Sequence, residues 1–241
     1  MKLKSFFYAS ALVLTVGVAG CQNAGKNSEV KLTSKTDSVS YALGVLIGES
    51  NKQQMKEAPG VDQLNKEILI SAFEKAFRGD SVQIKPEKAN AALQKFFAEV
   101  SKAEGEKNQK TGEAFLAANK TKEGVVTLPS GLQYKILKAG TGVKPKAEDQ
   151  VKCNYEGKTI EGVVFDSSIK RGEPATFPVN RVIPGWTEAL QLMPVGSKWE
   201  LYIPAALAYG ERGAGKDIKP NSTLIFQVEL LDIVKPEAPK K

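Results

Sequence analysis

Apolar residues recur at helical spacing along the first half of the chain. Three stripes with intervals of three and four residues predict three helices. The first stripe is Val39, Leu43, Leu46 and Ile47; the second is Leu64, Ile68, Ala72 and Ala76, flanked by Leu69, Phe73 and Phe77; the third is Ala89, Leu93, Phe96, Phe97 and Val100. The second helix should run from about Asp62 to Arg78 and end in a left-handed cap at Gly79. Pro86 suits the first turn of the third helix.

The apolar stripe thins after Val100. Residues 101–113 are mostly charged or polar, and helical character resumes at 114–118. Gly105 and Gly112 each disfavour a helix by ~1 kcal/mol relative to Ala. The third helix therefore either continues to about Asn119, as a rod of ~50 Å, or breaks near one of these glycines. We interpret this stretch as a solvated spacer between two bodies.

From Leu128 onward the apolar positions alternate, which is typical of strands. The alternating sets are Leu132, Tyr134 and Ile136; Trp199, Leu201 and Ile203; and Leu224, Phe226, Val228 and Leu230. Glycine-rich residues 140–142 and 210–215 predict turns, and residues 187–192 predict one short helix. The chain is therefore expected to have an α+β fold: an all-helical N-terminal module, a long connecting helix, and a C-terminal antiparallel sheet wrapped around one short helix.

This division gives a helical domain with its linker helix at 36–120, a sheet domain at 128–234 and a frayed tail at 235–241. The first two helices are short and have wide apolar faces. About sixty residues of helix hardly bury a sufficient core alone. Dimerisation through these helices would supply the missing surface, and a monomeric bundle folded back on itself is the alternative.

The N-terminus has the features of a targeting segment. Lys2 and Lys4 precede an apolar run of thirteen residues, Phe6 to Val18, which is shorter than the ~20 that a spanning helix needs. The run leads into Val18-Ala-Gly-Cys21, which resembles a bacterial lipobox. We expect residues 1–20 to be removed, Cys21 to be lipidated, and residues 21–35 to form a flexible tether. An ordinary secretory peptide cleaved elsewhere is the alternative.

These features predict an extracytoplasmic lipoprotein anchored to a bacterial membrane, in the outer membrane or facing the periplasm. Cys153 is then the second and last cysteine of the chain, so no intramolecular disulfide can form in the lipidated protein. Cys153 alternates with Val151 and Tyr155 and is expected to be a small buried hydrophobe.

Composition narrows the chemistry further. The net charge of +7 is spread along the chain without a basic stripe interleaved with aromatics, which argues against nucleic-acid binding. The chain has no histidine, and its sequence has no phosphate loop, nucleophile–base pair or cluster of metal ligands. We expect no cofactor and no metal.

Three segments instead combine aromatic and branched apolar residues with one carboxylate. They are residues 163–168 (Val-Val-Phe-Asp-Ser-Ser), 182–186 (Val-Ile-Pro-Gly-Trp) and 208–210 (Ala-Tyr-Gly). A site with these groups can hold an apolar ring and remove it from water. It lacks the usual equipment for hydrolysis, which indicates a reaction that breaks no covalent bond. Taken singly, Trp186 and Phe226 fit core positions, Asp166 fits a turn or a cap, and Tyr209 before Gly210 fits a loop.

The ordered set resembles the FKBP-type peptidyl-prolyl cis-trans isomerase domain. The matching motifs are Asn154-Tyr-Glu-Gly157, Val164-Phe-Asp-Ser-Ser168, Phe177, Val182-Ile-Pro-Gly-Trp186, Ala208-Tyr-Gly210 and Ser222-Thr-Leu-Ile-Phe226. With the helical module and the lipobox, the whole chain resembles the Mip-like (macrophage infectivity potentiator) branch. This resemblance implies a homodimer whose N-terminal helices and long connecting helix hold two isomerase domains apart.

The resemblance also implies roles for residues of the site. Trp186 would form the floor under a prolyl ring, and Tyr209 and Ile218 would come from a flap-like loop above it. The Tyr209 hydroxyl and the Ile183 N–H would bind substrate carbonyls, and Asp166, held by Tyr155 and Arg171, would face the prolyl amide. The walls would be Tyr155, Phe165, Phe177, Val182, Ile183 and Phe226. Ala175 stands where the family often has an aromatic residue.

Two functions follow as expectations. The first is a membrane-tethered isomerase that acts on proline-containing exported polypeptides during folding. The alternative is a dimeric extracytoplasmic chaperone that holds unfolded chains, with weak or vestigial isomerase activity. The first activity would need only residues 128–241, whereas suppression of aggregation would need residues 36–120.

Overall fold

The computed structural model describes residues 29–56 and 58–234 of the 241-residue chain. The predicted signal peptide, the proposed lipidation site Cys21, the first part of the tether and the tail at 235–241 lie outside these residues. Residues up to Lys52 form one unit and those from Gln53 onward form another. The helices are α1 (Lys35–Lys56), η1 (Val61–Gln63), α2 (Lys66–Arg78), α3 (Pro86–Asn119), α4 (Ser168–Arg171), η2 (Val179–Arg181), α5 (Pro184–Leu192), η3 (Ala205–Leu207) and η4 (Gly210–Arg212). None of the helices in the described ranges is long and apolar enough to span a bilayer.

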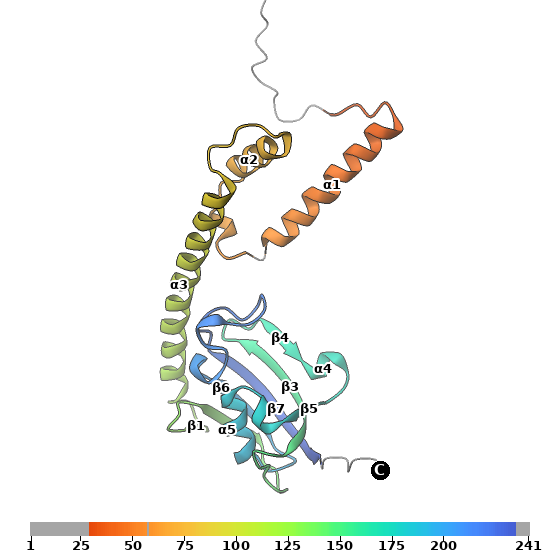
Figure 1. Ribbon diagram of the computed structural model, residues 1–241. Coiled ribbons are helices and arrows are strands. Elements are labelled where there is room, and N and C mark those ends of the chain that lie inside the picture. Colours follow the sequence, from red (N-terminus) through yellow and green to blue (C-terminus); the bar gives the residue numbers. More distant parts are fainter. Residues whose placement is uncertain (1–28, 57, 235–241) are drawn as a thin grey trace, which may run out of the picture. The chain divides into compact units, whose positions relative to one another are not determined.

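The predicted α+β fold is confirmed. The strands are β1 (Val125–Thr127), β2 (Gln133–Lys138), β3 (Gln150–Thr159), β4 (Val164–Ser167), β5 (Ala175–Pro178), β6 (Lys198–Ile203) and β7 (Leu224–Val234). They form one seven-stranded sheet in the order β1-β2-β6-β7-β3-β4, with β5 also paired to β3. Every pairing is antiparallel. Figure 1 shows the sheet together with the helices.

The second helix differs from its prediction at the N-terminal end. Val61–Gln63 form a separate 3₁₀ turn, and α2 begins only at Lys66. The break arises because the Asn65 side chain caps α2 by accepting hydrogen bonds from the N–H groups of Glu67 and Ile68 at 3.0 and 3.2 Å. The predicted cap at the other end is confirmed, since Gly79 has a left-handed backbone with φ 77°.

The third helix is continuous, which settles the choice between an unbroken and a broken helix. α3 runs for 34 residues from Pro86 to Asn119, with the proline in its first turn. Its buried residues are Gly105, Gly112 and Asn119. The interpretation of the whole stretch as a solvated spacer was therefore wrong, because the second half of α3 packs against the sheet domain. Both glycines lie at contact positions: a Cβ atom at Gly112 would overlap Thr223, and one at Gly105 would press on Pro220 and Asn221.

The end of α3 is fixed to the sheet by polar groups. The Asn119 side chain donates a hydrogen bond to Gln133 Oε1 at 3.0 Å, and the Gln133 amide donates to the Leu116 carbonyl at 2.9 Å. The Phe115 ring packs against Tyr202 with 6.1 Å between centroids. These contacts join the last turns of α3 to β2 and β6.

The core lies between the sheet and α5, which crosses one face of the sheet in Figure 1. Trp186, Ala189 and Leu190 from α5 pack among the inward-facing residues of β3, β6 and β7. Pro184 begins α5 two residues before Trp186, earlier than the predicted start at Thr187. This early start places the indole ring in the first turn of the helix, at the edge of the core.

Candidate active site

Trp186 lies at the centre of an aromatic cluster. The rings of Tyr155, Phe177 and Phe226 meet the indole nearly at right angles, with centroid distances of 5.3, 5.7 and 5.3 Å. Phe165 extends the cluster by packing edge-on against Phe226 at 5.5 Å. The strands β3, β4, β5 and β7 and the helix α5 each supply one of these rings, so the sheet register fixes the cluster. Edge-to-face contacts of this kind suit the charge distribution of aromatic rings.

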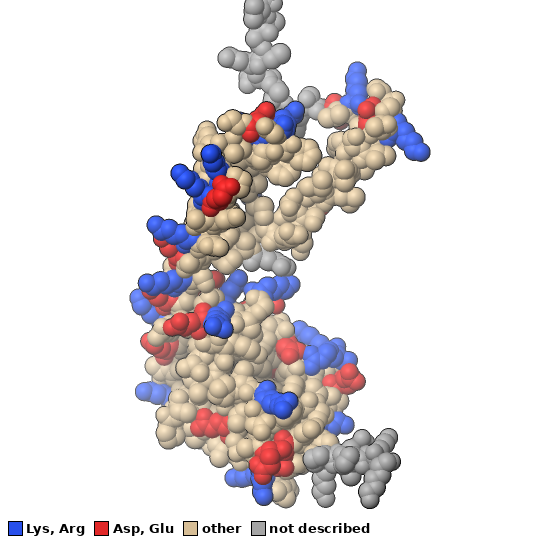
Figure 2. All heavy atoms as spheres, viewed as in Figure 1, with Lys and Arg blue, Asp and Glu red and all other residues tan. Residues whose placement is uncertain are grey.

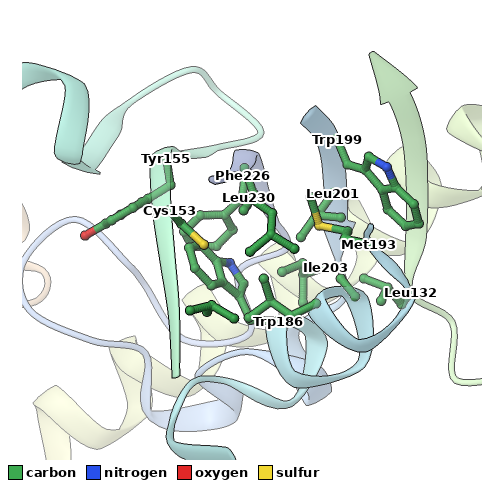
Figure 3. Close-up of a cluster of buried hydrophobic side chains, with 14 of the residues drawn as sticks. Leu132, Cys153, Tyr155, Trp186, Met193, Trp199, Leu201, Ile203, Phe226 and Leu230 are labelled. Carbon is green, nitrogen blue, oxygen red and sulfur yellow. The ribbon is translucent and has the colours of Figure 1, made fainter. Parts of the chain in front are cut away.

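The solvent exposure of the rings increases from one side of the cluster to the other. Trp186, Phe226 and Tyr155 are 4, 4 and 5% exposed, whereas Phe165 and Phe177 are half-buried. Figure 3 shows the Tyr155 hydroxyl directed away from the buried side chains. An apolar ring could therefore enter from the side of Phe165 and Phe177 and meet only aromatic surface below it.

Gly157 makes room for two of these rings. It pairs with Asp166 on one side of β3 and with Phe226 on the other. A Cβ atom at this position would lie 2.5 Å from Phe226 and 2.7 Å from Phe165, closer than real Cβ atoms approach other groups. The rings therefore lie directly over the glycine backbone, and any side chain here would displace them.

Tyr155, Asp166 and Arg171 form a closed polar triangle beside the cluster. The Tyr155 hydroxyl donates to Asp166 Oδ2 at 2.5 Å, and Arg171 donates to the same hydroxyl at 2.7 Å and to Asp166 Oδ1. Burial raises the pKa of Asp166, but the hydrogen bonds from Tyr155 and Arg171 outweigh burial and hold that pKa below its usual value. The carboxyl group is therefore an anion at neutral pH.

Two serines position this triangle. The Ser167 side chain caps α4 by accepting the Lys170 N–H at 3.2 Å, and Arg171 follows at the end of the same short helix. Ser168 Oγ accepts the Tyr155 N–H at 2.8 Å, which ties α4 to β3. The cap of α4 is therefore Ser167 and not Asp166. Asp166 is left available for the site.

Four further predicted residues come from the connections around α5 and after β6. Val182 and Ile183 immediately precede α5 and pack against the core. Within residues 29–56 and 58–234, the Ile183 N–H has no hydrogen-bond acceptor. Ile218 is 7% exposed, joins the core, and is held by paired backbone hydrogen bonds with Ala214 at 2.8 and 3.2 Å.

Tyr209 is the most exposed aromatic residue of the predicted set. Its side chain is 39% exposed and lies between η3 and η4. Burial raises the pKa of the Tyr209 phenol, and the negative charge of Asp166 raises it further. The hydroxyl therefore remains a hydrogen-bond donor over a wide pH range.

Ala175 occupies the first position of β5, opposite Cys153 on β3. It is half-buried and packs against the core. Because the Ala175 side chain is a methyl group, this position adds no aromatic surface to the site. The aromatic lining at this end therefore depends on Phe177, two residues later on the same strand.

The sequence did not single out Gly157, Ser167 or Ser168 as functional. Gly157 could have been found from its place in an alternating strand, where a glycine marks a close approach. The Ser-Ser pair could have been found as a cap for the basic residues that follow. Their contacts with other strands depend on register and could not be derived from spacing.

Comparisons with known proteins show the family to which the chain belongs. Residues 141–231 match the family model for the FKBP-type peptidyl-prolyl cis-trans isomerase, and residues 36–136 match the domain amino-terminal to it. The chain is 44% identical to the outer membrane protein MIP of Legionella longbeachae, over 91% of this chain and 95% of that protein. It is 47% identical to the FKBP-type peptidyl-prolyl cis-trans isomerase FkpA of Aeromonas hydrophila, over 82% of this chain and 76% of that protein.

A solved structure also resembles the chain. The crystal structure of FkpA from Escherichia coli matches with a TM-score of 0.64 at 36% identity, covering 84% of this chain and 98% of that one. The two family models follow one another along the sequence in the order of the helical region and the sheet domain. The chain therefore belongs to the FKBP-type peptidyl-prolyl cis-trans isomerase family, in the branch that carries an amino-terminal domain.

Proposed function

We propose that this isomerase accelerates proline-limited folding of exported polypeptides by holding a prolyl residue against Trp186. The single observation that carries the proposal is the aromatic cluster, in which three rings meet the indole edge-on beside the Asp166 anion. Such a cup offers apolar surface to a pyrrolidine ring and one fixed negative charge at its edge. No proton transfer or nucleophile is required of it.

The physical basis is the loss of resonance in a twisted amide. A peptide bond rotates over a barrier of ~18–20 kcal/mol because its C–N bond is partly double. The planar amide places negative charge on oxygen, and water stabilises that form. In a water-poor pocket the planar form loses this stabilisation, while the twisted form loses less. Each 1.36 kcal/mol of differential binding gives a tenfold rate.

We assign the remaining groups by what they can offer to such a substrate. The Ile183 N–H and the Tyr209 hydroxyl are the donors for substrate carbonyls, supported by the lack of another acceptor for Ile183 in the described chain. Asp166 faces the prolyl amide, and Arg171 and Tyr155 hold it there. Phe165, Phe177, Val182 and Phe226 supply the walls, and Ile218 comes from the loop before β7.

The test compares two buried tryptophans of the same protein. Trp186→Ala should abolish most of the acceleration of proline-limited refolding, measured per folded molecule. Trp199→Ala is the matched control, because Trp199 is also 4% exposed but stacks on Tyr134 at 4.2 Å, at the other end of the core (Figure 3). Full activity in Trp186→Ala, or in Asp166→Leu, would contradict the proposal.

We further propose that the protein is a homodimer formed through α1 and α2. Val39, Leu43 and Leu46 are 59, 57 and 67% exposed on α1, and Phe73 and Phe77 are 50 and 75% exposed on α2. Residues 38–48 carry no charged side chain, and the middle of α1 is correspondingly uncharged in Figure 2. Exposed apolar surface on each of these helices favours a protein partner. Leu43→Glu with Leu46→Glu should halve the mass measured by light scattering; an unchanged mass would oppose the proposal.

The same exposed side chains favour the second candidate activity, the holding of unfolded chains. Phe73 and Phe77 stack at 5.9 Å and form an apolar surface that a client polypeptide could cover. Phe73→Ser with Phe77→Ser should lower the suppression of aggregation and leave the isomerisation of a short prolyl peptide unchanged. Unchanged suppression of aggregation would count against this activity.

We place the protein on a bacterial membrane through lipid on Cys21. The lipobox-like Val18–Cys21 and the preceding apolar run support this anchor, and one relative is named an outer membrane protein. Incorporation of labelled palmitate by the wild type but not by Cys21→Ser tests the anchor. Cleavage at another position, found by sequencing the mature N-terminus, would overturn it.

A further inference from the structure

The loop between β6 and β7 is held at one end by α3. It runs from residue 204 to 223 and contains Tyr209 and Ile218. The Asn108 side chain donates a hydrogen bond to the Pro220 carbonyl at 2.9 Å, across 112 residues of sequence. This bond links the linker helix to the loop that carries two residues of the proposed pocket.

Two glycines of α3 let the loop lie against the helix backbone. A Cβ atom at Gly105 would lie 3.2 Å from both the Pro220 ring and the Asn221 amide, and a Cβ atom at Gly112 would overlap the Thr223 hydroxyl. Gly105, Asn108 and Gly112 have spacing i, i+3 and i+7, so they share one face of the helix. This face makes the contact with residues 220–223.

Asn221 connects α3 to the segment that contains Tyr209. Its backbone is left-handed with φ 55°, the one positive φ outside glycine in the described chain, and its side chain lies beside Gly105. The Asn221 N–H donates a hydrogen bond to the Gly210 carbonyl at 2.9 Å. Gly210 directly follows Tyr209, so this hydrogen bond joins Asn221 to the residue next to Tyr209.

We propose that Asn108 is a positioning residue for prolyl isomerisation, acting through Pro220 and Asn221 on Tyr209. The inference rests on the proposed function, because it assigns Tyr209 to the substrate. α3 thereby contributes to the catalytic pocket without touching it. A loose loop would leave Tyr209 displaced from the position that meets the twisting amide, and small displacements of substrate-contacting groups lower rates strongly.

The surroundings of Asn108 distinguish a role in positioning the loop from a role in the stability of the core. Asn108 is only partly buried and lines a cavity of about 310 Å³ together with Lys219 and Ser222. Its side chain does not fill a closed core, so its replacement leaves the apolar packing intact. The cavity also gives space for a side chain that is one methylene longer.

The experiment uses the full chain with three substitutions. Asn108→Asp keeps the shape but removes the donor to Pro220, and Asn108→Gln restores an amide donor. Asn119→Asp is the matched control, because Asn119 is on the same helix but donates to Gln133 on β2. We measure kcat/KM on a short prolyl peptide per folded molecule, thermal stability, and hydrogen exchange of the Asn221 N–H.

Asn108→Asp should lower kcat/KM by roughly three- to tenfold and speed exchange at Asn221, and Asn108→Gln should recover most of both. Asn119→Asp should lower the melting temperature and leave both readings unchanged. The inference is overturned if Asn108→Asp keeps wild-type kcat/KM, or if Asn119→Asp lowers it equally. If the wild type has no isomerase activity, the proposed function is wrong. In that case hydrogen exchange alone tests the inference, and an unchanged exchange rate of the Asn221 N–H in Asn108→Asp would overturn it.

Discussion

The Tyr155 hydroxyl donates a hydrogen bond to Asp166 Oδ2 at 2.5 Å and accepts one from Arg171 at 2.7 Å. The phenol therefore stands between the cation and the anion while its ring forms part of the aromatic cluster. Burial raises the pKa of the Tyr155 phenol, and its hydrogen bond to Asp166 raises it further. One side chain thus contributes both to the apolar pocket and to the orientation of the carboxylate.

Tyr155→Phe should lower kcat/KM about tenfold, because it removes the hydroxyl that orients Asp166 and keeps the ring. The pKa of Asp166 should rise, since a hydrogen bond to its anionic form is lost. The rate is measured against pH on a short prolyl peptide. Tyr134→Phe, at the far end of the core against Trp199, is the control and should be fully active. Equal rates in the two variants would contradict this role of the hydroxyl.

Asp166→Asn should make stability less sensitive to acid. The pKa of Asp166 is depressed in the folded state, so the unfolded chain takes up its proton first as pH falls. The stabilisation is present above the ordinary carboxyl pKa of ~3.9 and is lost as pH falls through the depressed folded value. Urea midpoints at several acidic pH values measure this change. The exposed Asp80→Asn is the control, and identical acid slopes in wild type and Asp166→Asn would refute the linkage.

Gly112→Ala should destabilise the sheet domain although alanine favours helices. The helical gain is ~1 kcal/mol, but overpacking against Thr223 costs about 1–3 kcal/mol. Adding Thr223→Ala should restore much of the loss, because the overlapping hydroxyl is removed. Gly48→Ala, where a Cβ would meet nothing within 4 Å, should not destabilise. Denaturant unfolding measures all four proteins, and a Gly112→Ala chain that gains the full ~1 kcal/mol expected of alanine in a helix would exclude the close contact.

The Cys153 thiol should resist labelling in the native protein. Burial raises its pKa to about 12, its side chain is 0% exposed, and the thiolate is the reactive form. In a chain with Cys21→Ser, a thiol reagent at mildly alkaline pH should react only after urea is added. Rapid labelling without denaturant would show that the strand pairing of β3 opens easily.

The sequence predicted the elements that have strong periodicity. Residues 39–47 and 66–78 form helices where their apolar stripes are, and Gly79 ends α2 as expected. Alternation predicted β2, β6 and β7 from Leu132, Trp199 and Leu224 onward. The short strands β1, β4 and β5 were not predicted, because three or four residues hold too little pattern to distinguish a strand from a loop.

The candidate site residues were predicted from the order of the motifs along the chain and not from the spacing of the residues. Tyr155 and Trp186 meet at 5.3 Å because β3 and α5 pack on one another, which no local pattern contains. The contact of Asn108 with Pro220 was missed for a related reason. Gly105 and Gly112 indicated a weak helix when considered alone, and only the packed loop explains why glycine is needed there.

The unbroken α3 has a geometric consequence for changes in chain length. An α-helix turns ~100° per residue, and α3 is fixed to the sheet domain from Gly105 onward while Ala89 to Val100 precede that attachment. One residue inserted between Val100 and Gly105 therefore rotates the whole upstream stripe by about a quarter turn around the axis. An insertion of ~7 residues, close to two full turns, returns the stripe to nearly its original azimuth and only lengthens the arm.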